Sequence, residues 1–391
     1  MPWSENRKMD TRFAAIKDFH TGNYSKKAIC EIYGVSRPTL DKWINRFDVE
    51  GWKGMDDRSS RPLTSPNRTS DKIRKLILTL NTEKGWHNKK IHGNLELKYP
   101  HLQIPCPSTI HNIFKEHGRT SKYNRFRRWK HPGKPIYEAK KPNDVLSADY
   151  KGQFRMRDYR YCYPLTISCN YSRFLLGLFP HVGNRLEDAR RDFEVVFREF
   201  GLPKAILTDN GVPFATKGID GISQLNVWWT ELGIDHIRTQ PASPSQNGRH
   251  ERMHRELKRL TTRPPGKNYK DQGKKLEEFR TDYNYNLKHG GIGDVTPGSK
   301  YRVSRRLYPE KIKPPYYPSH FEVRRVSANG GFRWDCERVP ITHALSGKHI
   351  GLEQIDTGLY KVWFYKRFLG FYDEIKQKLE DKPGRLDRRH V

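Results

Sequence analysis

The order of strand-like and helix-like segments between residues 143 and 300 constrains the fold of this chain more than any other feature. Three apolar runs rich in β-branched and aromatic residues follow one another across turn residues, at 145–152, 160–169 and 173–182. After them we expect a helix over 186–201, a strand over 205–211, a helix near 225–232, a strand over 235–240, and helices over 248–260 and 276–285. This order, βββαβαβα with one closing helix, predicts an α/β domain over 143–305.

Residues 1–53 carry the pattern of a helix-turn-helix DNA-binding domain. A helix over 11–20 precedes the segment 25–47, in which a glycine turn separates two apolar stripes. Ser36 is a favourable N-cap for the second stripe, and Pro38 is tolerated in the first turn of a helix. We expect the exposed face of that helix to offer DNA-binding side chains, namely Arg37, Thr39, Lys42 and Arg46. An ordinary helical hairpin is the alternative.

A second helical region lies between two basic segments. Residues 54–70 form a Pro/Ser-rich linker whose Arg58 and Arg61 could enter a minor groove, although a solvated spacer fits equally well. Residues 71–118 contain three candidate helices, which we interpret as a second helix-turn-helix. Residues 119–142 interleave cations with aromatic residues, as in an arm that follows a DNA backbone, and a plain linker is the alternative. The DNA-binding candidates of this segment are Arg125, Arg127 and Arg128.

The C-terminal part of the chain has a different pattern. A Pro-rich linker over 306–319 precedes about five short strand-like runs separated by glycine turns, which predict a small all-β, SH3-like barrel over 320–375. Residues 376–391 read as a basic tail. Four cations of the barrel suggest non-specific DNA contact or contact between protomers: Arg324, Arg325, Lys366 and Arg367.

The charge of the chain predicts a polyanionic partner. There are 74 Lys and Arg against 44 Asp and Glu, a net charge of +30, and residues 1–142 alone hold 30 basic and 14 acidic side chains. Double-stranded DNA is favoured over a membrane, because no apolar run approaches the roughly 18 residues of a membrane span. The five scattered cysteines contain no C-x-x-C pair, and residues 1–10 lack a secretory pattern. We therefore expect a cytoplasmic, nucleoid-associated protein without disulfides.

Three acidic residues stand at positions that suit metal-dependent phosphoryl transfer. Asp149 lies in the first predicted strand, Asp209 ends a short apolar strand, and Glu251 follows one turn into a helix. Strand ends gather at one edge of an α/β sheet, and carboxylates meeting there repel one another unless a cation neutralises them. Oxygen ligands without thiolates favour Mg²⁺ or Mn²⁺, and two such ions can activate an attacking hydroxyl and stabilise a leaving oxygen. Arg255 and Lys258 share the helical face of Glu251 and are candidate phosphate ligands, a solvated Glu251–Arg255 pair being the alternative.

These motifs resemble a known family. The segments LSADYKG (146–152), LTDNGVPF (207–214) and QPASPSQNGRHERMHRELK (240–258) are similar to the three motifs of DDE transposases with a retroviral-integrase-type core. More narrowly, they resemble bacterial insertion-sequence transposases, and the domain order extends the resemblance over nearly the whole chain. The 41 residues 210–250 between the second and third acids exceed the retroviral spacing, and the front end lacks a His/Cys zinc pattern. Both departures favour the bacterial group.

The resemblance implies a multidomain fold and an activity. It implies helix-turn-helix units, an RNase H-like integrase core, and a catalytic triad of Asp149, Asp209 and Glu251 on two Mg²⁺ or Mn²⁺ ions. It further implies binding of the terminal inverted repeats of a mobile element, 3′-end cleavage, and strand transfer into target DNA. Lys258 would contact DNA, and four residues would shape the active-site edge: Asn210, Gly211, Asn247 and Gly248. We expect a homo-oligomer, because joining two element ends to one target needs more than one active site.

Two other functions compete with this interpretation. The run His250-Glu251-Arg252-Met253-His254 matches H-E-x-x-H, the zinc metalloprotease signature, with Glu277 or Glu278 as a third ligand. A protease would leave the net charge of +30 and both aspartate motifs unexplained. The other alternative is a DNA-binding regulator with an inactive integrase-like core.

Overall fold

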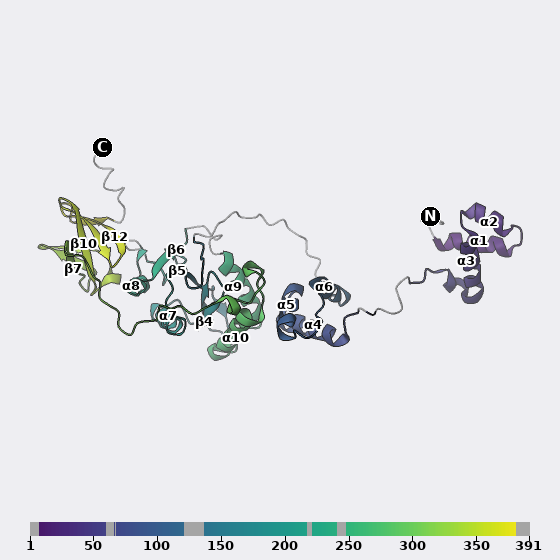
Figure 1. Cartoon of the computed structure of the whole chain (residues 1–391), viewed down its shortest axis with the longest axis horizontal. Helices are drawn as coiled ribbons and strands as arrows, with labels where there is room; N and C mark the ends of the chain where they lie inside the picture. The colour runs from purple at the N-terminus through teal and green to yellow at the C-terminus, as the bar shows by residue number, and fades with distance from the viewer. Residues whose placement is uncertain are drawn as a thin grey trace, which may run out of the picture. The chain divides into compact units, whose positions relative to one another are not determined.

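The structure is a computed structural model that describes residues 8–59, 66, 68–120, 137–216, 221–240 and 248–380. The chain divides into two compact units, Met1–Thr69 and Ser70–Val391 (Figure 1). The helices in the described part of the chain are all too short or too polar to cross a membrane.

The first unit contains the predicted helix-turn-helix. Its elements are α1 (Lys8–His20), α2 (Lys26–Tyr33), α3 (Arg37–Glu50) and the 3₁₀ helix η1 (Gly51–Met55). Ser25 caps α2 by accepting a hydrogen bond from the amide of Ala28 at 3.3 Å, and Gly34 ends it in the left-handed region at φ +61°. The helices pack around Ile29, Trp43 and other buried apolar side chains, so the expected apolar stripes form one small core.

A buried arginine completes this core. The side chain of Arg12 is 7% exposed, and its guanidinium lies 3.8 Å from the centroid of the Trp43 ring. It donates hydrogen bonds to the carbonyl of Met55 at 2.8 Å and to Asp57 at 2.7 Å. Arg12 therefore fixes the end of η1 against α1 and stacks on an aromatic face, which is how a buried guanidinium is usually satisfied.

The second helical region belongs to the second unit and packs on its α/β core. It comprises α4 (Asp71–Lys84), α5 (Asn88–Lys98) and α6 (Pro107–Glu116), as predicted over 71–118. Its apolar core includes Leu287, which is 1% exposed and comes from the chain after the core domain's last long helix. Asn94 of α5 donates a hydrogen bond to the carbonyl of Asn286 at 2.9 Å, and Lys90 forms an ion pair with Glu256. The predicted module is thus docked on the α/β core rather than attached only by a linker.

The α/β core is built on one mixed sheet. Its strands are β1 (Val145–Tyr150), β2 (Phe154–Arg155), β3 (Tyr161–Cys169), β4 (Leu175–His181), β5 (Ala205–Thr208) and β6 (Asp235–Arg238). The order is β2-β3-β1-β5-β6, with β4 also paired to β3. β1 is antiparallel to β3 and parallel to β5, and β5 is parallel to β6. The predicted strand order is confirmed, with the two-residue β2 as an addition.

Helices cover both faces of this sheet. They are α7 (Leu186–Phe200), α8 (Gln224–Glu231), α9 (Gly248–Thr261) and α10 (Tyr269–Thr281). Aromatic side chains of α7 and α8, such as Phe193 and Trp229, pack with Leu146 and Ile167 on one face. On the other face, α9 and α10 pack on Leu175 and Leu178 of β4, and Figure 1 shows the two helix pairs on opposite sides of the strands. After α10 come a π-helical turn η4 (Asp282–Asn286), the 3₁₀ helix η5 (Gly290–Ile292) and α11 (Pro297–Lys300).

The C-terminal region is all-β, as predicted, but holds more strands than expected. A five-stranded antiparallel sheet has the order β13-β12-β11-β10-β7, from β13 (Lys378–Glu380), β12 (Arg367–Asp373), β11 (Leu359–Phe364), β10 (His349–Asp356) and β7 (Phe321–Arg325). A hairpin of β8 (Gly331–Trp334) and β9 (Glu337–Pro340) and the 3₁₀ helix η6 (His343–Leu345) complete it. β13 extends the domain beyond the predicted limit of residue 375, because a three-residue strand with two charged ends has no readable apolar pattern.

The β domain shares its interior with the α/β core. Ile222, just before α8, is 0% exposed, and Val227, in α8, is 3% exposed. Both lie in the same apolar cluster as Phe332 and Tyr372 of the β domain. Lys348 of the β domain also forms an ion pair with Glu231 of α8. The Pro-rich segment predicted as a linker therefore joins two regions that are packed together.

Candidate active site

The three predicted acidic residues lie near one edge of the sheet. Asp149 is the fifth residue of β1, Asp209 directly follows β5, and Glu251 lies in the first turn of α9. β1 and β5 are parallel neighbours, with Ser147 beside Leu207, so their carboxyl ends reach the same edge. Burial, together with the negative charges of Asp209 and Glu251, raises the pKa of Asp149 to about 7. Asp209 and Glu251 therefore both lie within electrostatic reach of Asp149.

The turn after β5 orients Asp209. The Oδ1 atom of Asp209 accepts a hydrogen bond from the amide of Gly211 at 3.0 Å, and Asn210 Nδ2 donates to the carbonyl of Thr239 at 2.8 Å. A Cβ atom at Gly211 would lie 3.1 Å from the Asp209 carboxylate, so glycine leaves room for this turn. Asn210 and Gly211 thus lie at the edge where they were expected. Gly248 begins α9, whereas Asn247 lies outside the described residues.

Cations border the acidic group on the sheet and on α9. Lys151, two residues after Asp149, has its pKa lowered by burial and by the positive charge of Lys258, while Asp149 raises it. Lys258 and Arg255, the predicted phosphate ligands, are exposed on α9. Lys151 was not among the predicted site residues, although its position two residues beyond Asp149 places both on one side of an extended chain.

Two histidines of α9 lie behind the acidic group and share one hydroxyl. Thr166 of β3, which is fully buried, pairs with Asp149 in the sheet and donates a hydrogen bond to its carbonyl at 2.9 Å. The same Oγ1 lies 2.5 Å from His250 Nε2 and 2.9 Å from His254 Nε2. Burial lowers the pKa of His250 to about 4 and the pKa of His254 below its usual range, so both rings are neutral at pH 7.

The protease interpretation of the H-E-x-x-H run does not fit this geometry. Glu251, its supposed general base, is exposed, and both carboxylate oxygens of Glu277 are bonded to Arg280 at 2.7 and 2.8 Å. Among the described residues, the group that could hold a metal contains both histidines together with Asp149. The two histidines thus lie close to Asp149 at the edge of the sheet, and not close to a glutamate of α10.

The helix-turn-helix candidates differ in accessibility. Arg37 and Lys42 are exposed on α3, whereas Arg46 is half-buried with its guanidinium 4.9 Å from the centroid of the Trp43 ring. The hydroxyl of Thr39 lies 2.8 Å from that of Ser36, and Arg58 forms an ion pair with Glu50. The predicted DNA contacts Arg61, Arg125, Arg127 and Arg128 lie outside the described residues. Arg37 and Lys42 are therefore the described side chains on α3 that are best placed to reach DNA.

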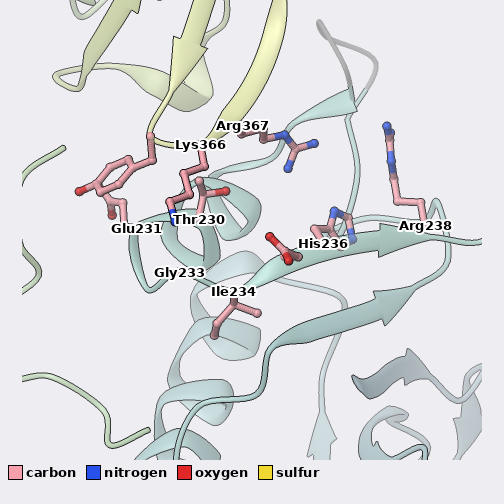
Figure 2. Close-up of a pocket in the computed structure, with 10 residues that line it drawn as sticks. Thr230, Glu231, Gly233, Ile234, His236, Arg238, Lys366 and Arg367 are labelled. Carbon is pink, nitrogen blue, oxygen red and sulfur yellow. The ribbon is translucent and has the colours of Figure 1, made fainter. Parts of the chain in front are cut away.

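A cationic cavity of about 760 Å³ lies on the outer side of β6 (Figure 2). Its walls come from α8, β6 and the turn between β11 and β12, and its lining includes Glu231, Asp235, His236, Arg238, Lys366 and Arg367. Burial, together with the positive charges of Arg367 and Arg238, lowers the pKa of His236 to about 3. The cavity does not include the three acids. It shows that two of the four predicted cations of the β domain lie beside the edge strand of the core.

Family models match most of the chain in sections. Residues 139–244 and 232–297 each match a model described as an integrase core domain, and together they include all three acids. Residues 12–62 match a helix-turn-helix domain, and residues 39–114 match a homeodomain-like domain. The helix-turn-helix class predicted for the N-terminal region is thereby confirmed, and the homeodomain-like match extends across the predicted linker 54–70.

Solved structures of retroviral integrases are similar to the chain at low identity. A simian T-cell lymphotropic virus intasome in complex with the PP2A regulatory subunit B56 gamma is 15% identical, covers 75% of this chain and 95% of its own, and has a TM-score of 0.39. The HTLV-2 integrase catalytic core domain in complex with magnesium is 13% identical in a trimeric and in a dimeric form. These cover 42% of this chain and 100% and 97% of their own, with TM-scores of 0.32 and 0.31.

Proposed function

We propose that this protein binds the terminal inverted repeats of a mobile element, cleaves the ends of the element and transfers them into target DNA. Its integrase core and helix-turn-helix domains are combined as in insertion-sequence transposases, which supports the proposal. The observation that carries the proposal is the placement of Asp209 and Glu251 within electrostatic reach of Asp149 at one edge of the sheet. Burial and mutual repulsion disfavour the charged form of Asp149 there, so the site gains stability when a cation enters it.

The donor set fits hard divalent ions. Three carboxylates from separate elements supply oxygen ligands, and the described cysteines near the sheet, Cys162 and Cys169, are buried in the interior. Asp149, Asp209 and Glu251 would hold two Mg²⁺ or Mn²⁺ ions, which supply Lewis-acid activation of the attacking and leaving oxygens when bound. The turn at Gly211 and the sheet pairing of β1 hold two of these carboxylates in place before any ion arrives.

The cations around the site position the DNA. Lys258 and Arg255 project from the same helix as Glu251 and can bind phosphates on either side of the scissile bond. Lys151 adds a positive charge beside Asp149 on the sheet. On the first unit, Arg37 and Lys42 of α3 would read or follow a groove of the terminal repeat. Recognition and chemistry thus reside in different domains, and a homo-oligomer would bring two ends to one target.

The test is cleavage of a labelled DNA that carries the element's own ends. Wild type, Asp209→Asn and the matched control Asp235→Asn are compared with Mg²⁺ and with EDTA. Asp235 lies on the neighbouring strand β6 and is exposed, so its substitution changes the same charge outside the site. We expect metal-dependent 3′-hydroxyl products from wild type and from Asp235→Asn, and intact DNA with unchanged end binding for Asp209→Asn.

Two results would contradict the proposal. Equal cleavage by Asp209→Asn and wild type would remove the catalytic assignment. Binding of the ends by all three proteins without any cleavage would favour the regulator with an inactive core.

A further inference from the structure

The hydrogen bonds around Thr166 decide which nitrogen of each histidine carries the proton. A threonine hydroxyl has one hydrogen, and the hydroxyl of Thr166 donates it to the carbonyl of Asp149. Its contacts with His250 Nε2 and His254 Nε2 must then be made by N–H donors on the rings. In a ring that donates from Nε2, the other nitrogen, Nδ1, is the atom that can offer a lone pair.

The two Nδ1 atoms have different surroundings. The Nδ1 atom of His250 lies 3.3 Å from the hydroxyl of Ser168, which can donate to it. No hydrogen bond reaches Nδ1 of His254 from any residue that the structure describes. This atom lies 3.8 Å from Oδ2 of Asp149, and the two residues belong with His250 to a group whose ligand atoms all lie within 4.8 Å of one another. Two potential metal ligands, Nδ1 of His254 and Oδ2 of Asp149, therefore lie close together at the acidic edge of the sheet.

The distance between these two atoms suits a shared ion. Metal–oxygen and metal–nitrogen bonds of about 2.0–2.2 Å place two ligands of one ion about 3 Å apart at a right angle and about 3.5 Å apart at a tetrahedral angle. The observed 3.8 Å lies a few tenths of an ångström beyond that range, which a small rotation of either side chain would close. The side chains of Asp149 and His254 are 21% and 11% exposed, so an ion between them would lose most of its water on this side.

We propose that His254 is a nitrogen ligand, through Nδ1, of the divalent ion held by Asp149. The inference rests on the proposed metal site and adds a fourth protein ligand of different chemistry to it. Imidazole nitrogen binds transition-metal ions better than Mg²⁺, so the site would discriminate in favour of Mn²⁺. Thr166 would act as a positioning residue that holds the His254 ring in the required tautomer, as outer hydrogen bonds do for metal-bound histidines. His250, with both ring nitrogens engaged, would have only a structural role.

The simpler interpretation is that both histidines only fasten α9 to β3. It explains the contacts with Thr166 and the burial of both rings. It leaves Nδ1 of His254 at 3.8 Å from a carboxylate oxygen of Asp149, without a hydrogen-bond donor among the described residues. The two interpretations differ in one measurable property, which is whether nitrogen binds the ion.

Pulsed electron paramagnetic resonance of Mn²⁺ bound to the full-length protein distinguishes them. Wild type, His254→Ala and the matched control His250→Ala are compared, after thermal melting has shown which variants are folded. We expect a ¹⁴N coupling to Mn²⁺ in wild type and in His250→Ala, and its absence in His254→Ala. Labelling the wild-type protein with ¹⁵N-histidine should convert the coupling to ¹⁵N, which tests the inference without any substitution.

Metal titrations give a second readout. His254→Ala should lower the affinity for Mn²⁺ by about 10- to 100-fold and leave the affinity for Mg²⁺ within about 3-fold of wild type. Mn²⁺ binding without any histidine coupling would overturn the inference while leaving the three-acid site intact. A coupling lost only in His250→Ala would also overturn it. If wild type binds no Mn²⁺ at all, the inference and the metal site of the proposed function fail together.

Discussion

Replacing Thr166 with valine would remove one hydroxyl from the interior between β3 and α9. The side chain is fully buried, and its hydroxyl has three partners: the Asp149 carbonyl, His250 Nε2 and His254 Nε2. Valine has nearly the same shape but neither donates nor accepts hydrogen bonds. The variant therefore leaves two buried imidazole N–H groups without their acceptor, while the apolar packing of β3 changes little.

The expected loss of stability follows from those two groups. A buried donor without a partner costs about 1–3 kcal/mol, and the added methyl group returns at most about 1 kcal/mol. The net destabilisation is then about 1–6 kcal/mol, and in a domain of this size each kcal/mol lowers the melting temperature by roughly 2–4 °C. Thr166→Ser is the matched control, because it keeps the hydroxyl and loses one methyl group, at about 1 kcal/mol.

The assay is thermal unfolding of the metal-free protein, with wild type and both variants compared at pH 7. Amide hydrogen exchange along α9 reports whether the loss is local to the histidine pair. We expect Thr166→Val to be clearly less stable than Thr166→Ser and to exchange faster in α9. Equal stability of the two variants would refute the hydrogen-bond assignment, since the serine variant alone retains the hydroxyl.

Three further predictions concern other parts of the chain. Leu287→Ala should cost about 2–5 kcal/mol of docking energy and make α4–α6 sensitive to limited proteolysis, whereas Leu307→Ala, at a residue 77% exposed, should not. The pKa of Asp149 is raised to about 7, above its unfolded value of about 4, so the stability that its protonation contributes is lost as the pH rises from about 4 to 7. Because the carboxylate form binds metal, added Mg²⁺ should raise the melting temperature more at pH 8 than at pH 5.5. Equal shifts at the two pH values would contradict this. Charge reversal at Arg37 and Lys42 should reduce discrimination between the terminal repeat and random DNA, and a change in the salt dependence alone would mean that they touch only phosphate.

The positions of the three acids could be predicted from the sequence because each depends on local patterns. A short apolar run followed by Asp209-Asn210-Gly211 reads as a strand that ends in a turn, and parallel strands bring such ends together. The helix of Glu251 follows from its 3.6-residue periodicity. These patterns do not depend on which surfaces pack against each other, so the sequence alone is enough to place the three acids on their elements.

The histidine network depends on such packing and could not be predicted. It requires the register that sets Asp149 opposite Thr166, and it requires α9 to cross β3 at this point. The sequence offered only H-E-x-x-H, in which spacing along the helix suggested a zinc site with α10. The docking of α4–α6 through Leu287 was missed for the same reason, because one leucine after a helix has no periodic signal.

The most direct test of the central claim uses a DNA end whose scissile bond has sulfur in place of the bridging 3′ oxygen. If an ion held by the three acids contacts the leaving oxygen, the sulfur substrate should resist cleavage with Mg²⁺ and be cut with Mn²⁺, which accepts sulfur more readily. The natural substrate should be cut with both ions. Cleavage of the sulfur substrate at equal rates with either ion, or without any, would contradict the account.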